Sequence, residues 1–311
     1  MQIRSSRRFT TRLFALAIAV GIASCGGGGG DAGSSSSSSP GTPNGQPAPP
    51  PTTAKNSKRG MAYDLASAGD MAAVSPNVSW WYNWSPTPNA GLPADYETRF
   101  GMEFIPMLWN GNFNDAQIVA YLSAHPSIKY LLVLNEPNLV DQANMTPSQA
   151  AALWPRYEAI AAQTGVKIVG PAMNWGTLPG YSDPIVWLDA FYADYEAANG
   201  GRAPRIDYLA MHWYDYGLAQ QLDRLDKYGK QIWVTEFANW HGGSDGSQID
   251  TLAAQQAQMQ EMVTTCEMRP DVFRYAWFTG RENPDPHFTS LLGAEGQLTP
   301  LGTEYLKLTG S

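Results

Sequence analysis

The sequence predicts an α/β protein: a single (β/α)₈ barrel that follows an amino-terminal tether. Three observations support this fold class. Eight short apolar or aromatic runs alternate with longer amphipathic runs from about residue 55 onward. The part of the chain from there onward is similar in length to one such barrel, which needs about 250 residues. Polar and aromatic side chains also gather just after the apolar runs, where barrels carry their functional residues.

Runs rich in β-branched and aromatic residues predict the eight strands. They span residues 60–63, 78–82, 104–109, 130–134, 167–171, 208–213, 231–236 and 273–278. Amphipathic runs between them predict helices over residues 114–124, 147–163, 184–199, 218–228 and 247–266. Asn114, Thr146-Pro147 and Asp183-Pro184 are helix-start signals. An open doubly wound sheet is the alternative, and it is less favoured because no strand–turn–helix segment carries its glycine fingerprint.

The first 54 residues are expected to lie outside the barrel. Arginines before residue 13, an apolar stretch over residues 13–23 and the ending Ile22-Ala23-Ser24-Cys25 predict a secretory signal over residues 1–25. This ending resembles the lipobox of bacterial lipoproteins, which implies that Cys25 carries lipid; an ordinary signal peptide is the alternative. Residues 26–54 are rich in Gly, Ser and Pro and predict a disordered linker. We therefore expect an exported catalytic domain over residues 55–311, anchored at the periplasmic face or the cell surface, or else secreted.

Composition excludes several classes of function. A net charge of -8 and a pI near 5.0 argue against nucleic acid as a partner, because no basic patch is available for phosphates. If Cys25 carries lipid, Cys266 has no partner for a disulfide. The four histidines have no metal-site spacing, and the domain has no phosphate-binding glycine loop. We expect no metal, no organic cofactor and a monomer.

Two predicted strands end in a glutamate. Glu136 follows the fourth strand within Asn-Glu-Pro, and Glu236 closes the seventh. Strands four and seven lie across a barrel of this kind, so the two carboxyl groups could face one another over a bound sugar. Hydrolysis of a glycosidic bond needs such a pair, one to protonate the leaving oxygen and one on the other side of the anomeric carbon. For each glutamate alone, a solvent-facing or helix-capping role is the alternative.

Aromatic residues recur at the predicted strand ends and suggest flat platforms for sugar rings. Trp81, Trp109 and Trp240 are candidate glycan contacts, and Asn110 beside Trp109 is another. Tyr214, two residues past His212, could donate a hydrogen bond to Glu236. Asn135, beside Glu136, could hold the sugar 2-hydroxyl.

Asn-Glu-Pro on the fourth strand, His212-x-Tyr214 on the sixth, a glutamate closing the seventh and Trp277 on the eighth together resemble the clan of retaining (β/α)₈ glycosidases. Within that clan, Leu-Asn-Glu-Pro-Asn and Trp-Val-Thr-Glu-Phe are similar to glycoside hydrolase family 128, whose members are endo-acting β-1,3-glucanases. The resemblance implies that Glu136 is the acid/base and that Glu236 is the nucleophile of a covalent glycosyl-enzyme. It also implies that the subsite for the cleaved sugar of a β-glucan is lined by Asn135, His212, Tyr214 and Trp277.

Two alternatives stay open. A related enzyme of the same clan could act on cellulose, mannan or xylan, because linkage preference depends on the shape of the binding site. A non-catalytic, surface-anchored glycan-binding lipoprotein is the other alternative. The presence of both glutamates argues against it, since a pure binder has no use for an acid/base pair.

Overall fold

The computed structural model describes residues 55–308, which fall within one compact unit. The predicted signal peptide over residues 1–25, the lipidation of Cys25 and the linker over residues 26–54 lie outside the described residues. They stay predictions, as do the exported location and the monomeric state. Within the described part, no helix is both long enough and apolar enough to cross a membrane.

All strands pair in parallel within one sheet, in the order β3-β2-β1-β9-β8-β7-β6-β5-β4. Their bounds are β1 Arg59–Ala62, β2 Trp80–Tyr82, β3 Glu103–Phe104, β4 Met107–Leu108, β5 Tyr130–Val133, β6 Lys167–Met173, β7 Tyr208–Trp213, β8 Ile232–Phe237 and β9 Val272–Trp277. The strand predicted over residues 104–109 is therefore divided into β3 and β4 by Ile105 and Pro106. A proline has no N–H to give to a ladder, which interrupts the pairing at this point.

The divided strand also closes the barrel. The Ile105 N–H donates to the Trp81 carbonyl of β2 at 2.9 Å, and the Leu132 N–H of β5 donates to the Pro106 carbonyl at 2.9 Å. Two consecutive residues thus bond to β2 and to β5, which lie near opposite ends of the strand order. The predicted (β/α)₈ barrel is confirmed, and the open sheet is wrong.

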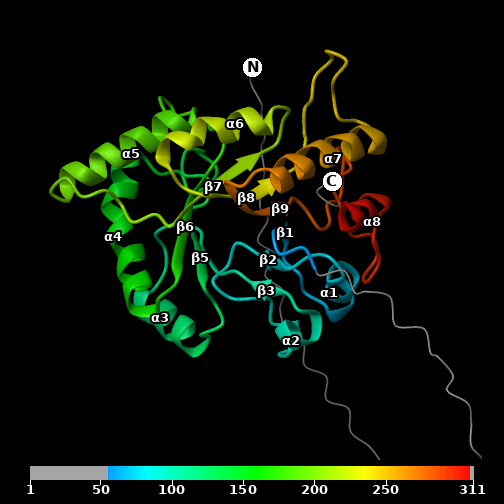
Figure 1. Ribbon diagram of the computed structural model, residues 1–311, viewed down its shortest axis with the longest axis horizontal. Helices are drawn as coiled ribbons and strands as arrows, with labels where there is room; N and C mark the ends of the chain where they lie inside the picture. Colours follow the sequence, from blue (N-terminus) through cyan, green and yellow to red (C-terminus); the bar gives the residue numbers. More distant parts are fainter. Residues whose placement is uncertain (1–54, 309–311) are drawn as a thin grey trace, which may run out of the picture. The chain divides into compact units, whose positions relative to one another are not determined.

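The helices lie around the outside of the strands (Figure 1). They are α1 Ala68–Val74, α2 Tyr96–Phe100, α3 Asp115–Ala124, α4 Pro147–Thr164, α5 Pro184–Ala198, α6 Leu218–Leu225, the 3₁₀ turn η1 Asp226–Tyr228, α7 Leu252–Met268 and α8 Pro300–Lys307. The side chains of Asn114, Thr146 and Asp183 accept hydrogen bonds from the first turns of α3, α4 and α5, as their start signals predict. The helix predicted over residues 247–266 starts too early, because Thr251 caps α7 and the five residues before it form a loop.

The core has two layers, which follow from the alternation of side chains along each strand. One buried cluster draws only on strand residues and their immediate neighbours, and so fills the barrel. It includes Ala62, Trp80, Tyr82, Ile105, Met107, Leu132, Val169, Ala172, Ala210, Trp233, Ala276 and Phe278. The other cluster joins the opposite faces of the strands to the helices. Which layer a strand residue enters therefore decides whether it can reach the inside of the barrel.

Arg59 is a fully buried cation that ties β1 to the end of the chain. Its guanidinium donates to the Tyr305 carbonyl at 2.6 Å, to the Leu308 carbonyl, and to the Tyr275 hydroxyl at 3.0 Å. A second cation, Arg99, lies exposed at the end of α2 over the Phe100 ring.

We expect Arg59→Met to lower the free energy of unfolding by about 3 kcal/mol, because it leaves the buried Tyr305 carbonyl and the partly buried Leu308 carbonyl without this donor. Arg99→Met is the matched control and should change it by less than ~0.5 kcal/mol. Urea denaturation of both variants measures the difference. Equal midpoints for the two variants would show that the Arg59 contacts do not stabilise the fold.

Candidate active site

Glu136 stands just beyond the carboxyl end of β5 and is only 2 % exposed. Its Oε1 accepts hydrogen bonds from His212 Nδ1 at 2.8 Å and from Asn174 Nδ2 at 2.9 Å. The backbone around it is strained, since Leu134 and Glu136 have φ angles of 60° and 46°, in the left-handed region that other residues than glycine rarely adopt. Such strained residues concentrate at functional sites.

Glu236 reaches the inside of the barrel because of a β-bulge. Met211 on β7 pairs with Val234 on β8, but the next residue, His212, pairs with Glu236, so Thr235 is an extra residue. Val234 and Phe237 both pack in the outer layer, although regular alternation would place residues three apart on opposite faces. The bulge therefore turns Glu236 inward, where regular alternation would have pointed it at the helices.

Three groups donate hydrogen bonds to the Glu236 carboxylate. The Tyr82 hydroxyl and Trp84 Nε1 both donate to Oε1 at 2.8 Å, and the Tyr214 hydroxyl donates to Oε2. Burial raises the pKa of Tyr82, and the nearby charge of Glu236 raises it further. The Tyr82 phenol is thus kept protonated and remains a donor, which fixes the orientation of the Glu236 carboxylate.

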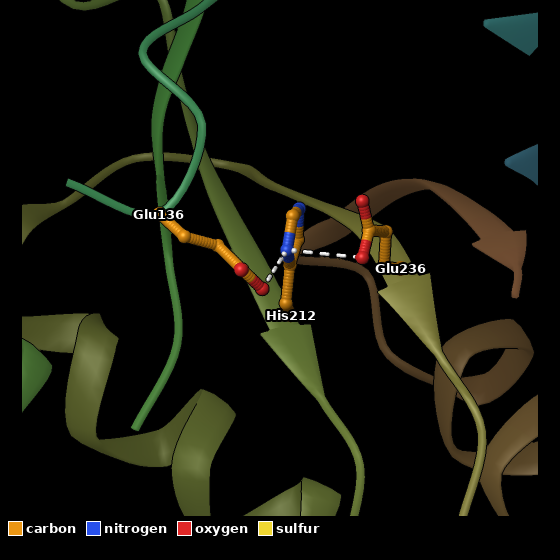
Figure 2. Close-up of side chains that lie close together, drawn as sticks. All are labelled: Glu136, His212 and Glu236. Atoms are coloured by element: carbon orange, nitrogen blue, oxygen red, sulfur yellow. Dashed lines mark hydrogen bonds and ion pairs between the residues drawn. The ribbon is translucent and has the colours of Figure 1, made fainter. Parts of the chain in front are cut away.

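His212 lies between the two glutamates and is fully buried. Its Nδ1 is 2.8 Å from Glu136 Oε1 and 3.4 Å from Glu236 Oε2. In Figure 2 the two carboxyl groups reach toward the imidazole from opposite sides. One oxygen of each glutamate and the ring nitrogen all lie within 4.8 Å of one another, so the two carboxyl groups can act on the same small group of atoms.

These three side chains are also the set of donor atoms in the described residues that could hold a metal ion. Their surroundings fit a carboxyl pair better than an ion. N–H and O–H donors point at the carboxylate oxygens from Asn174, Tyr82 and Tyr214, and they compete with a cation for the same lone pairs. His212 Nδ1 would also have to give up its 2.8 Å contact with Glu136 Oε1.

The other predicted site residues divide between the two layers of the core. Asn135 is buried beside Glu136, and Trp109 and Trp240 pack against the cluster inside the barrel. Trp240 stacks on Tyr214 with 4.2 Å between ring centroids. The Asn110 side chain instead accepts a hydrogen bond from the Asn112 N–H of its own loop, so a glycan contact from it stays a prediction.

Trp81 and Trp277 do not line the site. Both are fully buried in the outer layer, where Trp81 packs on Tyr96 and Phe104, and Trp277 on Phe237 and Tyr305. The expectation that they contact glycan was wrong, because each lies on a strand whose neighbouring residues face inward. Tyr82 and Phe278, one position further along, are the residues that enter the barrel.

The ring of Phe278 is the centre of an aromatic group next to Glu236. Its centroid lies 5.9 Å from Trp84, 5.8 Å from Tyr214 and 5.4 Å from Trp240. Sequence reasoning did not single out Tyr82, Trp84, Asn174 or Phe278 as site residues. Their position at strand ends was visible, and counting alternate residues from the inward-facing ones would have selected Tyr82 over Trp81.

Comparison with known proteins identifies the family to which the chain belongs. A family model described as a glycosyl hydrolase catalytic core matches residues 60–305. A solved structure of a family 128, subgroup II endo-β-1,3-glucanase from Pseudomonas viridiflava is 65 % identical, covers 83 % of this chain and 100 % of its own, and has a TM-score of 0.82. The chain belongs to glycoside hydrolase family 128.

Two further similar proteins have lower sequence identity to this chain. A subgroup I endo-β-1,3-glucanase of family 128 from Amycolatopsis mediterranei, solved with laminaritriose, is 26 % identical over 81 % of this chain and 99 % of its own, with a TM-score of 0.60. Alkali-sensitive linkage protein 1 of Schizosaccharomyces pombe is 25 % identical over 81 % of this chain. The chain spans 44 % of the length of that protein. Membership of family 128 makes this protein a glycoside hydrolase.

A histidine beside the family 128 site joins two loops at the barrel end. His241 Nδ1 is 2.9 Å from Asp215 Oδ1, in the loop after β7, and its Nε2 is 2.9 Å from Asp245 Oδ2, in the loop after β8. The Tyr216 ring packs against the imidazole on a third side. Hydrogen bonds to the two carboxylates raise the pKa of His241 above its ordinary value of 6.5. We call Asp215, His241 and Asp245 the histidine clasp.

Because the pKa of His241 is raised on folding, the stabilisation from the clasp is complete below pH 6.5 and declines as the pH rises through the folded pKa. We expect an NMR titration of the imidazole to give a pKa above 6.5, and Asp245→Asn to bring that pKa down. Protection of the Ile249 N–H, which donates to the His241 carbonyl at 2.9 Å, should weaken at high pH relative to core amides. A titration at or below the ordinary histidine value would contradict the charged clasp.

Proposed function

We propose that this protein is an endo-β-1,3-glucanase that cleaves its substrate with retention of configuration, through a covalent glycosyl-enzyme. The separation of the two glutamates carries the proposal. One oxygen of Glu136 and one of Glu236 lie within 4.8 Å of each other. Carboxyl groups about 5–5.5 Å apart are typical of retaining glycosidases, whereas inverting enzymes need about 6.5–9.5 Å to admit a water molecule.

In the first step Glu136, in its acid form, gives its proton to the glycosidic oxygen while the Glu236 carboxylate attacks the anomeric carbon. The bond to the leaving sugar breaks, that sugar departs as an alcohol, and an ester joins Glu236 to the remaining glycan. In the second step water attacks the same carbon and gives a proton to the Glu136 carboxylate. The ester bond breaks, which restores both glutamates.

The hydrogen bonds of each glutamate support this division of roles. Glu236 is held by Tyr82, Trp84 and Tyr214, and donors of this kind hold a nucleophilic carboxylate in one orientation. The partners of Glu136 include His212 and Asn174, and His212 Nδ1 also lies 3.4 Å from Glu236. A proton on the imidazole Nδ1 orients Glu136 when that group is the base of the second step.

Asn135 supports binding of the sugar at the cleavage point. Its side chain is 3 % exposed, its Nδ2 donates to Gln142 Oε1 at 3.2 Å, and its Oδ1 has no hydrogen-bond partner among the described residues. A buried acceptor without a donor costs about 1–3 kcal/mol. A sugar hydroxyl beside Glu136 would supply the donor, in keeping with the 2-hydroxyl contact that we expect for this residue.

The choice of β-1,3-glucan rests on the relatives. The Pseudomonas viridiflava enzyme, at 65 % identity, is an endo-β-1,3-glucanase, and the Amycolatopsis mediterranei enzyme was crystallised with laminaritriose. Cellulose, mannan and xylan remain the competing substrates to be tested. The paired carboxyl groups favour an enzyme over a glycan-binding protein, because a pure binder gains nothing from a second buried acid next to the first.

We expect the wild-type protein to release a range of short oligosaccharides from laminarin, and to release no reducing sugar from cellulose, mannan or xylan. Glu236→Gln should lower kcat on laminarin by at least about 10⁴-fold, because it removes the nucleophile at nearly constant volume. Binding of laminarihexaose, measured by calorimetry, should stay within about threefold of the wild type. Glu196→Gln on the outer helix α5 is the matched control and should retain full activity. Hydrolysis of laminarin by Glu236→Gln at the wild-type rate would contradict the role of Glu236.

A further inference from the structure

Trp175 is the one exposed tryptophan of the eleven in the chain, all of which lie in the described part. Its side chain is 47 % exposed, although an indole is among the largest apolar surfaces that a protein can bury. The residue follows β6, in the loop that begins with Asn174. An exposed, aromatic, positioned side chain next to a catalytic site suggests a contact surface for a ligand.

Two hydrogen bonds connect Trp175 to Glu136 through the side chain of Asn174. The Trp175 N–H donates to Asn174 Oδ1 at 2.8 Å, and Asn174 Nδ2 donates to Glu136 Oε1 at 2.9 Å. The same asparagine side chain therefore fixes both the carboxyl group and the start of the loop that carries the indole.

The loop after β6 is held in place by Asn138, which lies two residues beyond Glu136. Asn138 Nδ2 donates to the Asn174 carbonyl at 2.8 Å, and the Thr177 N–H donates to the Asn138 carbonyl at 3.0 Å. Gly176 lies so close that a Cβ there would come within 2.1 Å of the Asn138 carbonyl oxygen. The backbone on both sides of Trp175 is thus fixed to the segment that carries Glu136.

One side of the indole is occupied by a charged pair. The Arg224 guanidinium carbon lies 5.8 Å from the ring centroid, within the range of a cation–π contact. Arg224 is itself held by Asp183, with Nη2 at 2.8 Å from Oδ1 and 2.6 Å from Oδ2. The ring therefore has a fixed support and an exposed remainder, which is the arrangement of a stacking platform.

The position of Trp175 in the barrel indicates which part of a bound substrate its side chain can contact. β6 lies next to β5, which carries Glu136, and β7 separates it from β8, which carries Glu236. The aromatic residues Trp84, Trp240 and Phe278 gather around Glu236 instead. In the proposed reaction Glu136 protonates the leaving oxygen, so the leaving part of the glycan departs on the Glu136 side.

We propose that Trp175 is a platform for a glucosyl unit of the leaving part of the glycan chain, and so a determinant of how oligosaccharides are bound across the cleavage point. This inference rests on the proposed function. The flat face of the indole would stack on the C–H face of the sugar ring. A substrate whose leaving group has no sugar ring would gain nothing from it.

Two β-1,3-glucosyl substrates that differ in the leaving group separate this role from a general one. Laminarihexaose has a sugar leaving group, and β-laminaritriosyl fluoride has a leaving group of one atom. We expect Trp175→Ala to lower kcat/KM for laminarihexaose about tenfold, equivalent to ~1.4 kcal/mol. The kcat/KM of Trp175→Ala for release of fluoride should stay within about twofold of the wild-type value. Trp175→Phe, which keeps a flat ring, should recover most of the loss.

Met268→Ala, at the exposed end of α7, is the control for removal of a surface apolar side chain. Circular dichroism and the thermal midpoint of each variant establish that it is folded. An equal loss on both substrates, or no loss on either, would overturn the platform. A wild-type protein that cleaves neither substrate would instead overturn the proposed function, and the platform with it.

Discussion

The site depends on one buried imidazole that lies between two buried carboxyl groups and is hydrogen-bonded to the first of them. A charged group without a partner inside a protein costs several kcal/mol, and here two acids and a histidine are buried side by side. They are tolerated because the imidazole lies close to both carboxyl groups and each carboxyl group accepts hydrogen bonds from further donors. His212 Nδ1 lies within 3.4 Å of both glutamates, so its position sets the distance between them.

The two glutamates differ in what surrounds them. Aromatic side chains supply the donors to Glu236, and amide and imidazole groups supply those to Glu136. The barrel makes the difference possible, because each glutamate sits among the strand ends of a different sector. Glu236 faces Tyr82 and Trp84 across the interior, whereas Glu136 faces the loop after β6. One acid is therefore surrounded by fixed aromatic donors, and the other adjoins a loop with an exposed ring.

Much of the fold could be predicted from the sequence because its signals are local. Strand periodicity and the caps Asn114, Thr146 and Asp183 each act through neighbouring residues, and the structure places elements where these signals indicate. The exceptions have local causes too. Pro106 divides the third strand, and the side chain of Thr251 caps α7 four residues after the predicted helix start.

The site could be predicted only in part, because side-chain direction depends on backbone irregularities. Regular alternation would have pointed Glu236 at the helices, and the bulge at Thr235 that turns it inward has no signature in the sequence. The same ambiguity of one position made Trp81 and Trp277 look like glycan contacts, when their neighbours Tyr82 and Phe278 enter the barrel. The strand-end positions of Glu136 and Glu236 identified the pair of glutamates and the family resemblance supported it, while the hydrogen bonds of Asn174 and Trp84 required coordinates.

The most direct test is to trap the covalent intermediate. An activated 2-deoxy-2-fluoro-β-laminaribioside slows the second step, so a retaining enzyme should accumulate one sugar ester per molecule. We expect intact-mass and peptide analysis by mass spectrometry to place that ester on Glu236. An ester on Glu136, or no ester together with inversion of the anomeric configuration by proton NMR, would contradict the roles given to the two glutamates.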